Sequence, residues 1–451
     1  MISVDELRSS FKGQVTTDGD TDYDISRWAK SAVRKAKYVA YPVDAEDVSK
    51  AILFARANNL ELAICGGRHS TAGASSSEGG LVIDLGKKMN NVRIDAEKQL
   101  AYVQGGARWG AVDEASMKHG LVALGGVVSD TGVGGLTVGG GYGWLTGEHG
   151  LVVDNLVSAT VVIASGEILI ASETENADLF WGIRGGGSNF GPVTEFVFKL
   201  HKQRSDVYFT ELVFASAKLP QILDEVEGWL KDQCPKEATH LAFAGGPDGS
   251  PCVVLFGFYN GSFEEGEARF GRFAALGPLL NKTRSLPYPE INNVLEFSIG
   301  ENRLFRGAFL PKFDKKVISR IDAARQKLVA EYPSTAKSTL VLELYHFGKV
   351  SSVPIDATAY PGRHGNSNIG MVFEWSDESL SSQARQISKS VMGDITDEET
   401  SGYGNFCDAD VGRGKDRVME QFGSNYTRLA IIKRKYDPEN VFHRWFAITP
   451  A

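Results

Sequence analysis

A histidine inside a glycine-rich segment is the residue of this chain whose type and setting point most directly to chemistry. His69 stands in the sequence Cys65-Gly66-Gly67-Arg68-His69-Ser70-Thr71-Ala72-Gly73, which follows an apolar run at residues 60–64. Glycine permits positive φ and lets the main chain approach a ligand closely. Successive N–H groups of such a segment form a concave nest that binds phosphate or another anion. The segment therefore predicts a phosphorylated ligand that lies along bare backbone beside an imidazole.

A second glycine-rich segment spans residues 125–143 and reads Gly-Gly-Val-Val-Ser-Asp-Thr-Gly-Val-Gly-Gly-Leu-Thr-Val-Gly-Gly-Gly-Tyr-Gly. Neither segment is a Rossmann fingerprint, which needs a preceding strand, a helix that begins within the glycines, and an acidic residue about 20 positions later. Residues 132–143 are too rich in glycine to open a helix, and the P-loop pattern is absent from the sequence. Two such nests predict one large phosphorylated cofactor.

These two segments resemble those of the FAD-linked oxidases of the vanillyl-alcohol-oxidase type. Two more segments match in the family order, namely Ala-Tyr-Val-Gln-Gly-Gly-Ala at 101–107 and Asp-Leu-Phe-Trp-Gly-Ile-Arg-Gly-Gly-Gly-Ser-Asn-Phe-Gly at 178–191. The tail is similar to the segment that closes the berberine-bridge-enzyme-like branch: Asn-Tyr-Thr-Arg-Leu at 425–429, then Lys-Tyr-Asp-Pro-Glu-Asn-Val-Phe at 435–442. The matches span roughly residues 32–205 and 400–445.

The resemblance implies an α+β fold with a two-part FAD-binding domain of the PCMH type. An antiparallel-sheet substrate domain, covered by helices on one face, is inserted between the two parts. The predicted boundaries are 1–205 for the main FAD part, 206–399 for the substrate domain and 400–451 for the C-terminal return. The residue pattern agrees, since strands at 207–214, 241–245, 252–259, 339–347 and 368–375 alternate with amphipathic helices at 219–233, 261–276 and 316–331.

The resemblance also implies that His69 is bonded covalently to the methyl group at the benzenoid edge of the flavin. Imidazole suits this role because its neutral ring nitrogen is nucleophilic near physiological pH. Many relatives have a second linkage through a cysteine four residues before Gly132, but that position is Val128. We therefore predict FAD attached through His69 only, and interpret Cys65 as a small buried hydrophobe.

The resemblance carries the predicted cofactor site onto both glycine-rich segments and one C-terminal asparagine. The predicted residues are Gly66, Gly67, Arg68, His69, Ser70, Thr131, Gly132, Gly134, Gly135, Gly139, Gly140, Tyr142 and Asn405. Thr131 occupies the position where the family places the residue that gates oxygen access. Leucine there impedes the reaction with oxygen and valine permits it, so the nearly isosteric threonine favours an oxidase. Its hydroxyl group could equally cap a nearby backbone group.

The catalytic base is harder to place. Relatives that oxidise sugars or alcohols often have a Tyr-x-Asn-Tyr segment whose second tyrosine is the base, but here that segment is Tyr403-Gly404-Asn405-Phe406. An alignment through residues 346–348 points Leu342 and Leu344 at the flavin and Glu343 away from it. A register slip of one residue would exchange the two faces.

Several side chains remain candidates for catalysis, each with structural hydrogen bonding as the alternative. They are Tyr403, Glu343 and His346, followed by His364 and Glu374. The predicted function is a flavoprotein oxidase that passes a hydride from an alcohol or related carbon centre to covalent FAD, with oxygen reduced to hydrogen peroxide. The alternatives are a dehydrogenase, an oxidative cyclase, or a flavin-binding protein that has lost catalysis.

Composition limits the partners. The 451-residue chain has a net charge of −8, which argues against nucleic acid or an anionic membrane. No run approaches the ~18 apolar residues of a membrane span, and no His/Cys/Asp cluster has metal-ligand spacing. The start lacks the apolar core of a signal peptide, which predicts an intracellular protein if this start is native and a secreted one if a leader was removed. The expected partners are a small-molecule substrate and oxygen, and the expected state is a monomer or small homo-oligomer.

Overall fold

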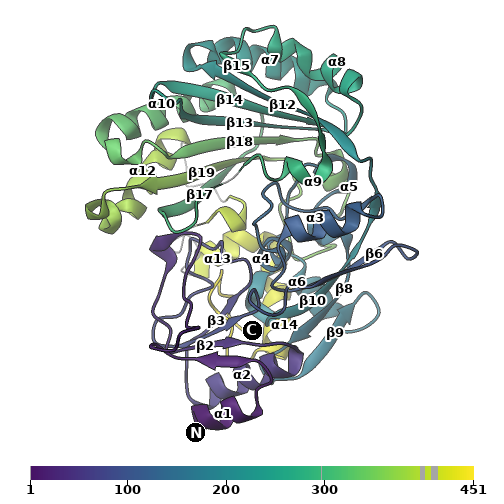
Figure 1. The fold of residues 1–451 in the computed structure, drawn as a ribbon, viewed down its shortest axis with the longest axis vertical. Coiled ribbons are helices and arrows are strands. Elements are labelled where there is room, and N and C mark those ends of the chain that lie inside the picture. Colours follow the sequence, from purple (N-terminus) through teal and green to yellow (C-terminus); the bar gives the residue numbers. More distant parts are fainter. Residues whose placement is uncertain (1, 296, 397–401, 408–414) are drawn as a thin grey trace.

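The computed structural model describes residues 2–295, 297–396, 402–407 and 415–451, and the boundary predicted at 399–400 lies outside them. The molecule has two halves, one above the other in Figure 1. The lower half contains the N-terminal part of the chain and the C-terminal helices, and the upper half contains a large antiparallel sheet with helices on its outer face. This mixture of helices and antiparallel sheets confirms the predicted α+β fold class.

The lower half is built on two sheets. The small sheet has the order β1-β2-β4-β3, in which β2, β4 and β3 are parallel and β1 is an antiparallel edge. Its strands are β1 Gln14–Thr16, β2 Tyr38–Tyr41, β3 Leu62–Cys65 and β4 Leu81–Asp84. The middle sheet is antiparallel with the order β5-β6-β10-β8-β9. Its strands are β5 Val92–Asp95, β6 Leu100–Gln104, β8 Leu156–Val162, β9 Ile168–Ser172 and β10 Val193–Lys199.

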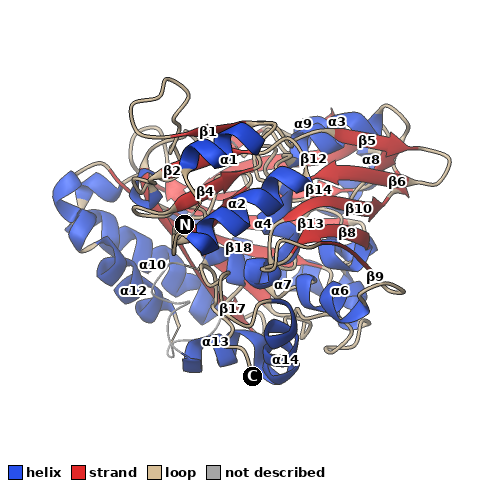
Figure 2. Cartoon of the chain, turned by 90° about the horizontal axis from the view of Figure 1, so that it is seen from below, coloured by secondary structure: helices blue, strands red, loops and turns tan. Residues whose placement is uncertain are grey.

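Helix α2, Ala45–Ala57, lies over the small sheet (Figure 2). The side chain of Asp44 caps it by accepting a hydrogen bond from the backbone N–H three residues later, at 3.0 Å. Val48 and Ile52 on its buried face pack into one core with Leu81 of β4. Each buried aliphatic side chain of this kind contributes about 1.5–3 kcal/mol. The small sheet is therefore anchored on one face. The histidine segment begins at the end of strand β3 in this sheet, so its starting point is fixed.

The remaining elements of the lower half are short. They are α1 Val4–Ser10, α3 Trp109–Met117, α4 Val133–Val138, α5 Thr146–His149, α6 Ala177–Ile183, α13 Lys415–Phe422 and α14 Tyr426–Tyr436, with the small strand pair β7 Leu121–Val122 and β11 His201–Lys202. The helices α13 and α14, drawn in yellow in Figure 1, lie beside elements from the first half of the chain.

In the part of the chain that the structure describes, no helix is both long and apolar enough to cross a bilayer.

Helix α4 corrects the prediction that residues 132–143 hold no helix. Glycine costs about 1 kcal/mol relative to alanine inside a helix, but here the glycines are needed for close packing. A side chain at Gly134 would place its Cβ only 2.9 Å from the carbonyl oxygen of Gly105. The packing of α4 against this backbone outweighs its poor intrinsic propensity.

The upper half is organised by one antiparallel sheet, which we call the roof sheet, with the order β15-β12-β14-β13-β18-β19-β17 and with β16 also paired to β12. Its strands are β12 Asp206–Ala215, β13 Glu237–Gly245, β14 Pro251–Tyr259, β15 Leu280–Asn281, β16 Arg284–Pro287, β17 Asn302–Leu310, β18 Thr339–Tyr345 and β19 Ser367–Trp375. Its outer face is covered by α7 Leu219–Asp232, α8 Phe263–Ala274, α10 Lys315–Glu331 and α12 Ala384–Ile395, and α9 Tyr288–Ile291 and α11 Gly348–Ser351 are short connections. The predicted strands and helices of this region are confirmed, and β17, α12 and the short elements were missed.

The register of β18 is the reverse of the one that the alignment predicted. Leu342 and Leu344 are fully buried in the core between the sheet and its helices. Glu343 is on the opposite face, where it lines a cavity. Placing the two leucines beneath the helices removes both from water, a contribution of about 1.5–3 kcal/mol each, whereas a carboxylate in that apolar core would be costly. The expected orientation of Leu342 and Leu344 toward the flavin was wrong.

Lys433 is the buried member of a basic cluster at residues 433–435, whose other two members, Arg434 and Lys435, are exposed. The side chain of Lys433 is fully buried, and its Nζ donates to Asn189 O at 2.7 Å, Phe442 O at 2.6 Å and Asp437 Oδ2 at 2.7 Å. Three acceptors satisfy the three N–H groups of the ammonium. Lys433 therefore fastens α14 to the segment around Asn189, and with it the C-terminal part of the lower half.

Candidate cofactor and active site

A cavity of about 350 Å³ lies between the two halves. Its floor consists of the two glycine-rich segments, and its roof is the inner face of the roof sheet. Residues 403–407 form part of its wall. All the predicted cofactor-binding residues except Gly140 line this cavity. Gly140 instead packs on the ring of Tyr360, to which an added Cβ would come within 2.7 Å.

The two glycine-rich segments touch backbone to backbone. A Cβ on Gly67 would lie 2.3 Å from the Cα of Gly132, and a Cβ on Gly132 would lie 2.5 Å from the nitrogen of Gly67. Real Cβ atoms do not approach other backbone atoms this closely, so only glycine fits at either position. This contact fixes the distance between the histidine of one segment and the residues before Gly132 in the other.

Gly135 shows the complementary behaviour. It lines the cavity, and an added Cβ would meet no atom within 4 Å. The backbone at this position is thus bare toward the cavity, as close approach of a ligand requires. Ser75 also lines the cavity, and its buried Oγ has no hydrogen-bond partner within the described residues. A bare helix backbone and an unpaired hydroxyl group suit the polar and phosphate groups of FAD.

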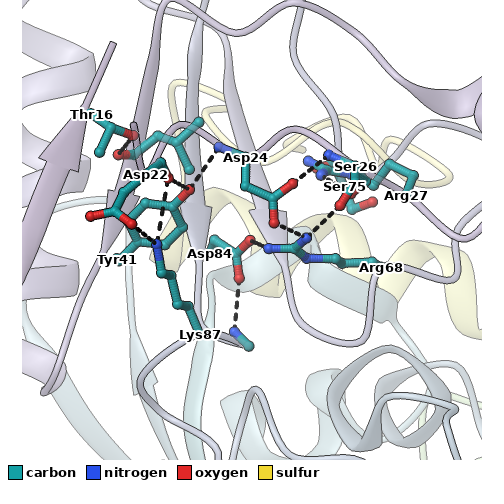
Figure 3. A network of polar contacts seen from close by, with 12 residues as sticks. Thr16, Asp22, Asp24, Ser26, Arg27, Tyr41, Arg68, Ser75, Asp84 and Lys87 are labelled. Atoms are coloured by element: carbon teal, nitrogen blue, oxygen red, sulfur yellow. Dashed lines mark hydrogen bonds and ion pairs between the residues drawn. The ribbon is translucent and has the colours of Figure 1, made fainter. Parts of the chain in front are cut away.

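The side chain of Arg68 forms an ion-pair network with residues near the histidine segment (Figure 3). Its guanidinium pairs with Asp24 and, at 2.7 Å, with Asp84 Oδ2, and it donates to Ser26 Oγ at 2.7 Å. Burial raises the pKa of Asp24, but the hydrogen bonds from Ser26 and Arg68 outweigh burial and lower that pKa to about 2. Arg68 adopts a φ of +66°, which is unusual for a residue with a side chain. The network stabilises this backbone turn immediately before His69.

His69 is held from two sides. Its Nε2 lies 3.2 Å from Asp130 Oδ1, on the second glycine-rich segment. Its ring stacks on the indole of Trp28, with centroids 5.1 Å apart and planes 18° apart. Both His69 and Trp28 line the cavity. The imidazole is therefore fixed in position and in plane at the edge of the space that the cofactor would occupy.

The two positions that the sequence analysis associated with a second linkage and with oxygen access also line the cavity. Val128 and Thr131 both contribute to the floor, next to Gly132. Valine has no nucleophile, so the residue present at this point offers no second bond to the flavin. Cys65 is fully buried, and burial raises the pKa of its thiol to about 12. Such a thiol is unreactive at neutral pH, as its interpretation as a buried hydrophobe requires.

Glu343 is the carboxyl group of the roof. It is buried, lines the cavity, and its Oε2 accepts a hydrogen bond from Asn368 Nδ2 at 2.8 Å. Burial raises the pKa of Glu343 to about 7, although the bond from Asn368 opposes the shift. Its cross-strand partner on β13, His240, also lines the cavity, and burial lowers the pKa of this histidine to about 3. At neutral pH His240 is thus uncharged, while Glu343 is poised to exchange a proton.

Tyr403 is anchored as a structural link between the wall and the floor. Its hydroxyl oxygen accepts hydrogen bonds from the Gly141 N–H at 3.1 Å and from Asn405 Nδ2 at 2.8 Å. Asn405 also donates to Leu136 O at 3.3 Å and fills the space that a Cβ on Gly139 would need. Burial raises the pKa of Tyr403, despite both hydrogen bonds. Tyr403 is therefore neutral and is better placed to orient groups than to accept a proton.

The other catalytic candidates lie away from the cavity lining. The ring of His346 is close to Gly348, to which an added Cβ would come within 2.7 Å. His364 is exposed. Glu374 is paired with Arg303 at 2.8 Å near the outer end of β19. The structure brings Glu343 and Tyr403 together around the cavity and leaves these three side chains outside it.

Part of the cavity lining is an aromatic wall, whose side chains were not identified as site residues from the sequence. Trp28 stacks on Phe305, with centroids 5.4 Å apart, and Phe305 stacks on Phe406 at the same distance. Phe256 and Phe297 complete this apolar part of the lining. These residues come from segments far apart in the sequence, and no local motif marks them. Their side chains make this part of the cavity lining apolar. Among the described residues, no cluster of three or more His, Cys, Asp or Glu side chains is arranged to hold a metal ion.

Comparisons with known proteins agree with this geometry. Residues 36–172 match the FAD binding domain family, and residues 402–448 match the family described as berberine and berberine like. The FAD-linked oxidoreductase pgmH of Aspergillus terreus is 34% identical, over 99% of this chain and 96% of that protein.

Two solved structures are also similar. The crystal structure of 6-hydroxy-D-nicotine oxidase from Arthrobacter nicotinovorans has a TM-score of 0.84 and 26% identity, over 98% of this chain and 99% of that one. Glucooligosaccharide oxidase from Acremonium strictum, whose structure contains a 6-S-cysteinyl, 8α-N1-histidyl FAD, has a TM-score of 0.84 and 22% identity, over 100% and 99%. The second likeness shows the fold alone.

The cavity, the paired glycine segments and the full-length similarity lead to one conclusion. This chain is an FAD-dependent oxidoreductase and belongs to the FAD-linked oxidases of the vanillyl-alcohol-oxidase type, in the berberine-bridge-enzyme-like branch.

Proposed function

We propose that this protein is a flavoprotein oxidase with FAD attached through His69 only, acting on a small aromatic or apolar alcohol or amine. The observation that carries this proposal is Glu343, one buried carboxyl group with a pKa raised to about 7 in an otherwise largely apolar roof. A general base works best when its pKa is near the ambient pH and it lies within reach of the substrate.

The proposed reaction divides the work between the cofactor and this chain's residues. When bound, FAD supplies the two-electron acceptor, and molecular oxygen regenerates it with formation of hydrogen peroxide. Glu343 accepts the proton of the substrate's hydroxyl or amine group as a hydride leaves the adjacent carbon. Asn368 orients the carboxylate through its 2.8 Å hydrogen bond. Thr131, which is smaller than leucine, leaves room for oxygen at the floor.

The lining favours a flat apolar substrate over a sugar. Phe305 and Phe406 stack with planes 16° apart and present aromatic surface to the cavity, as does Phe256 of strand β14. A sugar requires many polar partners, because each unpaired hydroxyl group costs free energy when it is buried. The similarity to an oxidase named for a hydroxylated nicotine supports a small aromatic substrate.

The proposal is tested by mixing the purified yellow protein anaerobically with panels of aromatic alcohols, aromatic amines and oligosaccharides. We expect aromatic compounds to bleach the flavin faster than oligosaccharides do, and air to restore the colour rapidly with one hydrogen peroxide per turnover. Slow reoxidation in air would instead identify a dehydrogenase. Failure of every compound in a broad panel to bleach the flavin would indicate a flavin-binding protein that has lost catalysis.

A further inference from the structure

The side chain of Asp130 faces His69 rather than the cavity. Its Oδ1 lies 3.2 Å from His69 Nε2. The neighbouring residues Val128, Thr131 and Gly132 line the cavity, and Asp130 is not part of that lining. The Asp130 carboxylate therefore acts on the imidazole and not on a bound ligand.

The backbone around Asp130 is held firmly. Ser129 N donates to Asn292 O at 2.9 Å, and Ser129 O accepts from Gly110 N at 2.8 Å. Thr131 O accepts from Trp109 N at 3.0 Å. The contact between Gly67 and Gly132 then fixes the separation of the two segments, since His69 is two residues after the first glycine and Asp130 two residues before the second. The approach of carboxylate to imidazole is thus set by the framework and not by flexible side chains.

The charge of Asp130 suits a hydrogen-bond acceptor. Burial raises the pKa of Asp130, but the hydrogen bond and charge of His69 and the charge of Arg108 outweigh burial and place this pKa below its ordinary value. An ionised carboxylate that accepts from Nε2–H keeps the proton on that nitrogen. The lone pair is then on Nδ1, and the stacking on Trp28 keeps the ring plane fixed.

We propose that Asp130 is the positioning residue for covalent attachment of FAD, because it selects the tautomer of His69 in which Nδ1 is the nucleophile. This inference rests on the proposed attachment at His69. A bond forms between Nδ1 and the carbon of the flavin's benzenoid-edge methyl group, and that carbon loses one hydrogen as a proton. The imidazole becomes cationic and then loses its Nε2 proton. The two electrons and two protons released in total pass to molecular oxygen and give hydrogen peroxide.

Asp130 stabilises the attachment at the point where positive charge develops. Alkylation of Nδ1 leaves an imidazolium whose Nε2–H faces the carboxylate, and a charge-assisted hydrogen bond is stronger than a neutral one. Removing the charge while keeping the shape should therefore slow the linkage. Hydrogen-bond partners that orient a metal-ligating histidine typically contribute a factor of about 10 to 100 to metal affinity or activity. By analogy, we expect Asp130→Asn to link FAD at least about tenfold more slowly.

The test uses full-length protein that is purified from a riboflavin-starved host. FAD is then added to this protein in air. Covalent incorporation is followed by flavin fluorescence on a denaturing gel, and total bound FAD by absorbance before denaturation. We expect Asp130→Asn to bind FAD but to link it at least about tenfold more slowly, Asp130→Glu to recover part of the rate, and the neighbouring control Ser129→Ala to link at the wild-type rate. Without oxygen, linkage in the wild type should bleach the flavin, and admission of air should restore the colour.

A second measurement does not depend on any variant's folding. The flavin peptide of the wild-type protein is isolated by digestion, and the attached imidazole nitrogen is identified by NMR. Attachment at Nδ1 supports the proposal, and attachment at Nε2 overturns it, as does an unchanged linkage rate in folded Asp130→Asn. A wild-type protein that binds FAD without ever linking it would instead overturn the proposed function.

Discussion

The floor and the roof of the cavity are built on different principles. The floor is a backbone surface, in which Gly67 and Gly132 touch directly and Gly135 leaves the main chain bare toward the cavity. The roof is a side-chain surface, in which alternate residues of β18 separate Glu343 from Leu342 and Leu344. An added Cβ at Gly67 or Gly132 would therefore force the two floor segments apart, whereas the roof can change its chemistry by one substitution. We infer that the floor serves the shared cofactor and the roof the particular substrate.

The largest effect should come from adding one methyl group to the floor. In Gly67→Ala the new Cβ would lie 2.3 Å from the Cα of Gly132, so the two segments must separate. We expect a loss of about 3 kcal/mol or more in the free energy of unfolding, together with loss of bound flavin. Denaturant unfolding and the absorbance of the purified protein measure both. Wild-type stability with full flavin content in this variant would show that the segments do not meet.

The next effect concerns the roof. Glu343→Gln preserves the size of the side chain and leaves the neighbouring Asn368 in place, but it removes the proposed base. We expect kcat/KM to fall by about 10²–10⁴ with flavin content unchanged. The matched control is Glu374→Gln, a buried carboxyl on the same sheet that pairs with Arg303 outside the cavity. That control should lower stability and leave the pH dependence of the reaction as in the wild type.

The pH dependence sharpens the same assignment. Glu343 is active as a base when deprotonated, and its pKa is raised to about 7. We therefore expect kcat/KM to be level above pH 7 and to fall about tenfold per pH unit well below it. Stopped-flow flavin reduction across this range gives the profile. If the acid limb persists unchanged in Glu343→Gln, another group is the base.

The smallest predicted effects are a gain in apoprotein stability and a loss of FAD affinity in one variant, Gly135→Ala. In Gly135→Ala the new Cβ meets no protein atom and lies in helix α4, so the apoprotein should gain up to about 1 kcal/mol of stability. The same Cβ enters the space proposed for FAD and should weaken FAD binding. Thermal unfolding of the apoprotein and FAD titration measure the two changes. If the variant gains stability and binds FAD as the wild type does, the cofactor does not lie along α4.

The floor could be predicted from the sequence because its geometry requires glycine, and a required residue type leaves a local pattern. Only Gly140 of the predicted cofactor residues is outside the cavity lining. The short helix α4 was missed, since its glycines serve packing against backbone such as that of Gly105, which no local pattern reveals.

The roof could be predicted as strands and helices, but which of its side chains face the cavity could not. A strand alternates in the same way in either register, and only the helices packed on its outer face decide that Leu342 and Leu344 turn toward them. Trp28, Phe305 and Phe406 come together only through tertiary structure. The pairing of His69 with Asp130 has the same origin, because 61 positions separate the two residues in the sequence.

The most direct test of attachment through His69 only is mass spectrometry of the acid-denatured, digested wild-type protein. We predict one FAD-derived modification, on the peptide that contains His69, and none on the peptide that contains Val128. Release of all the flavin on denaturation, or a linkage on any other residue, would contradict it.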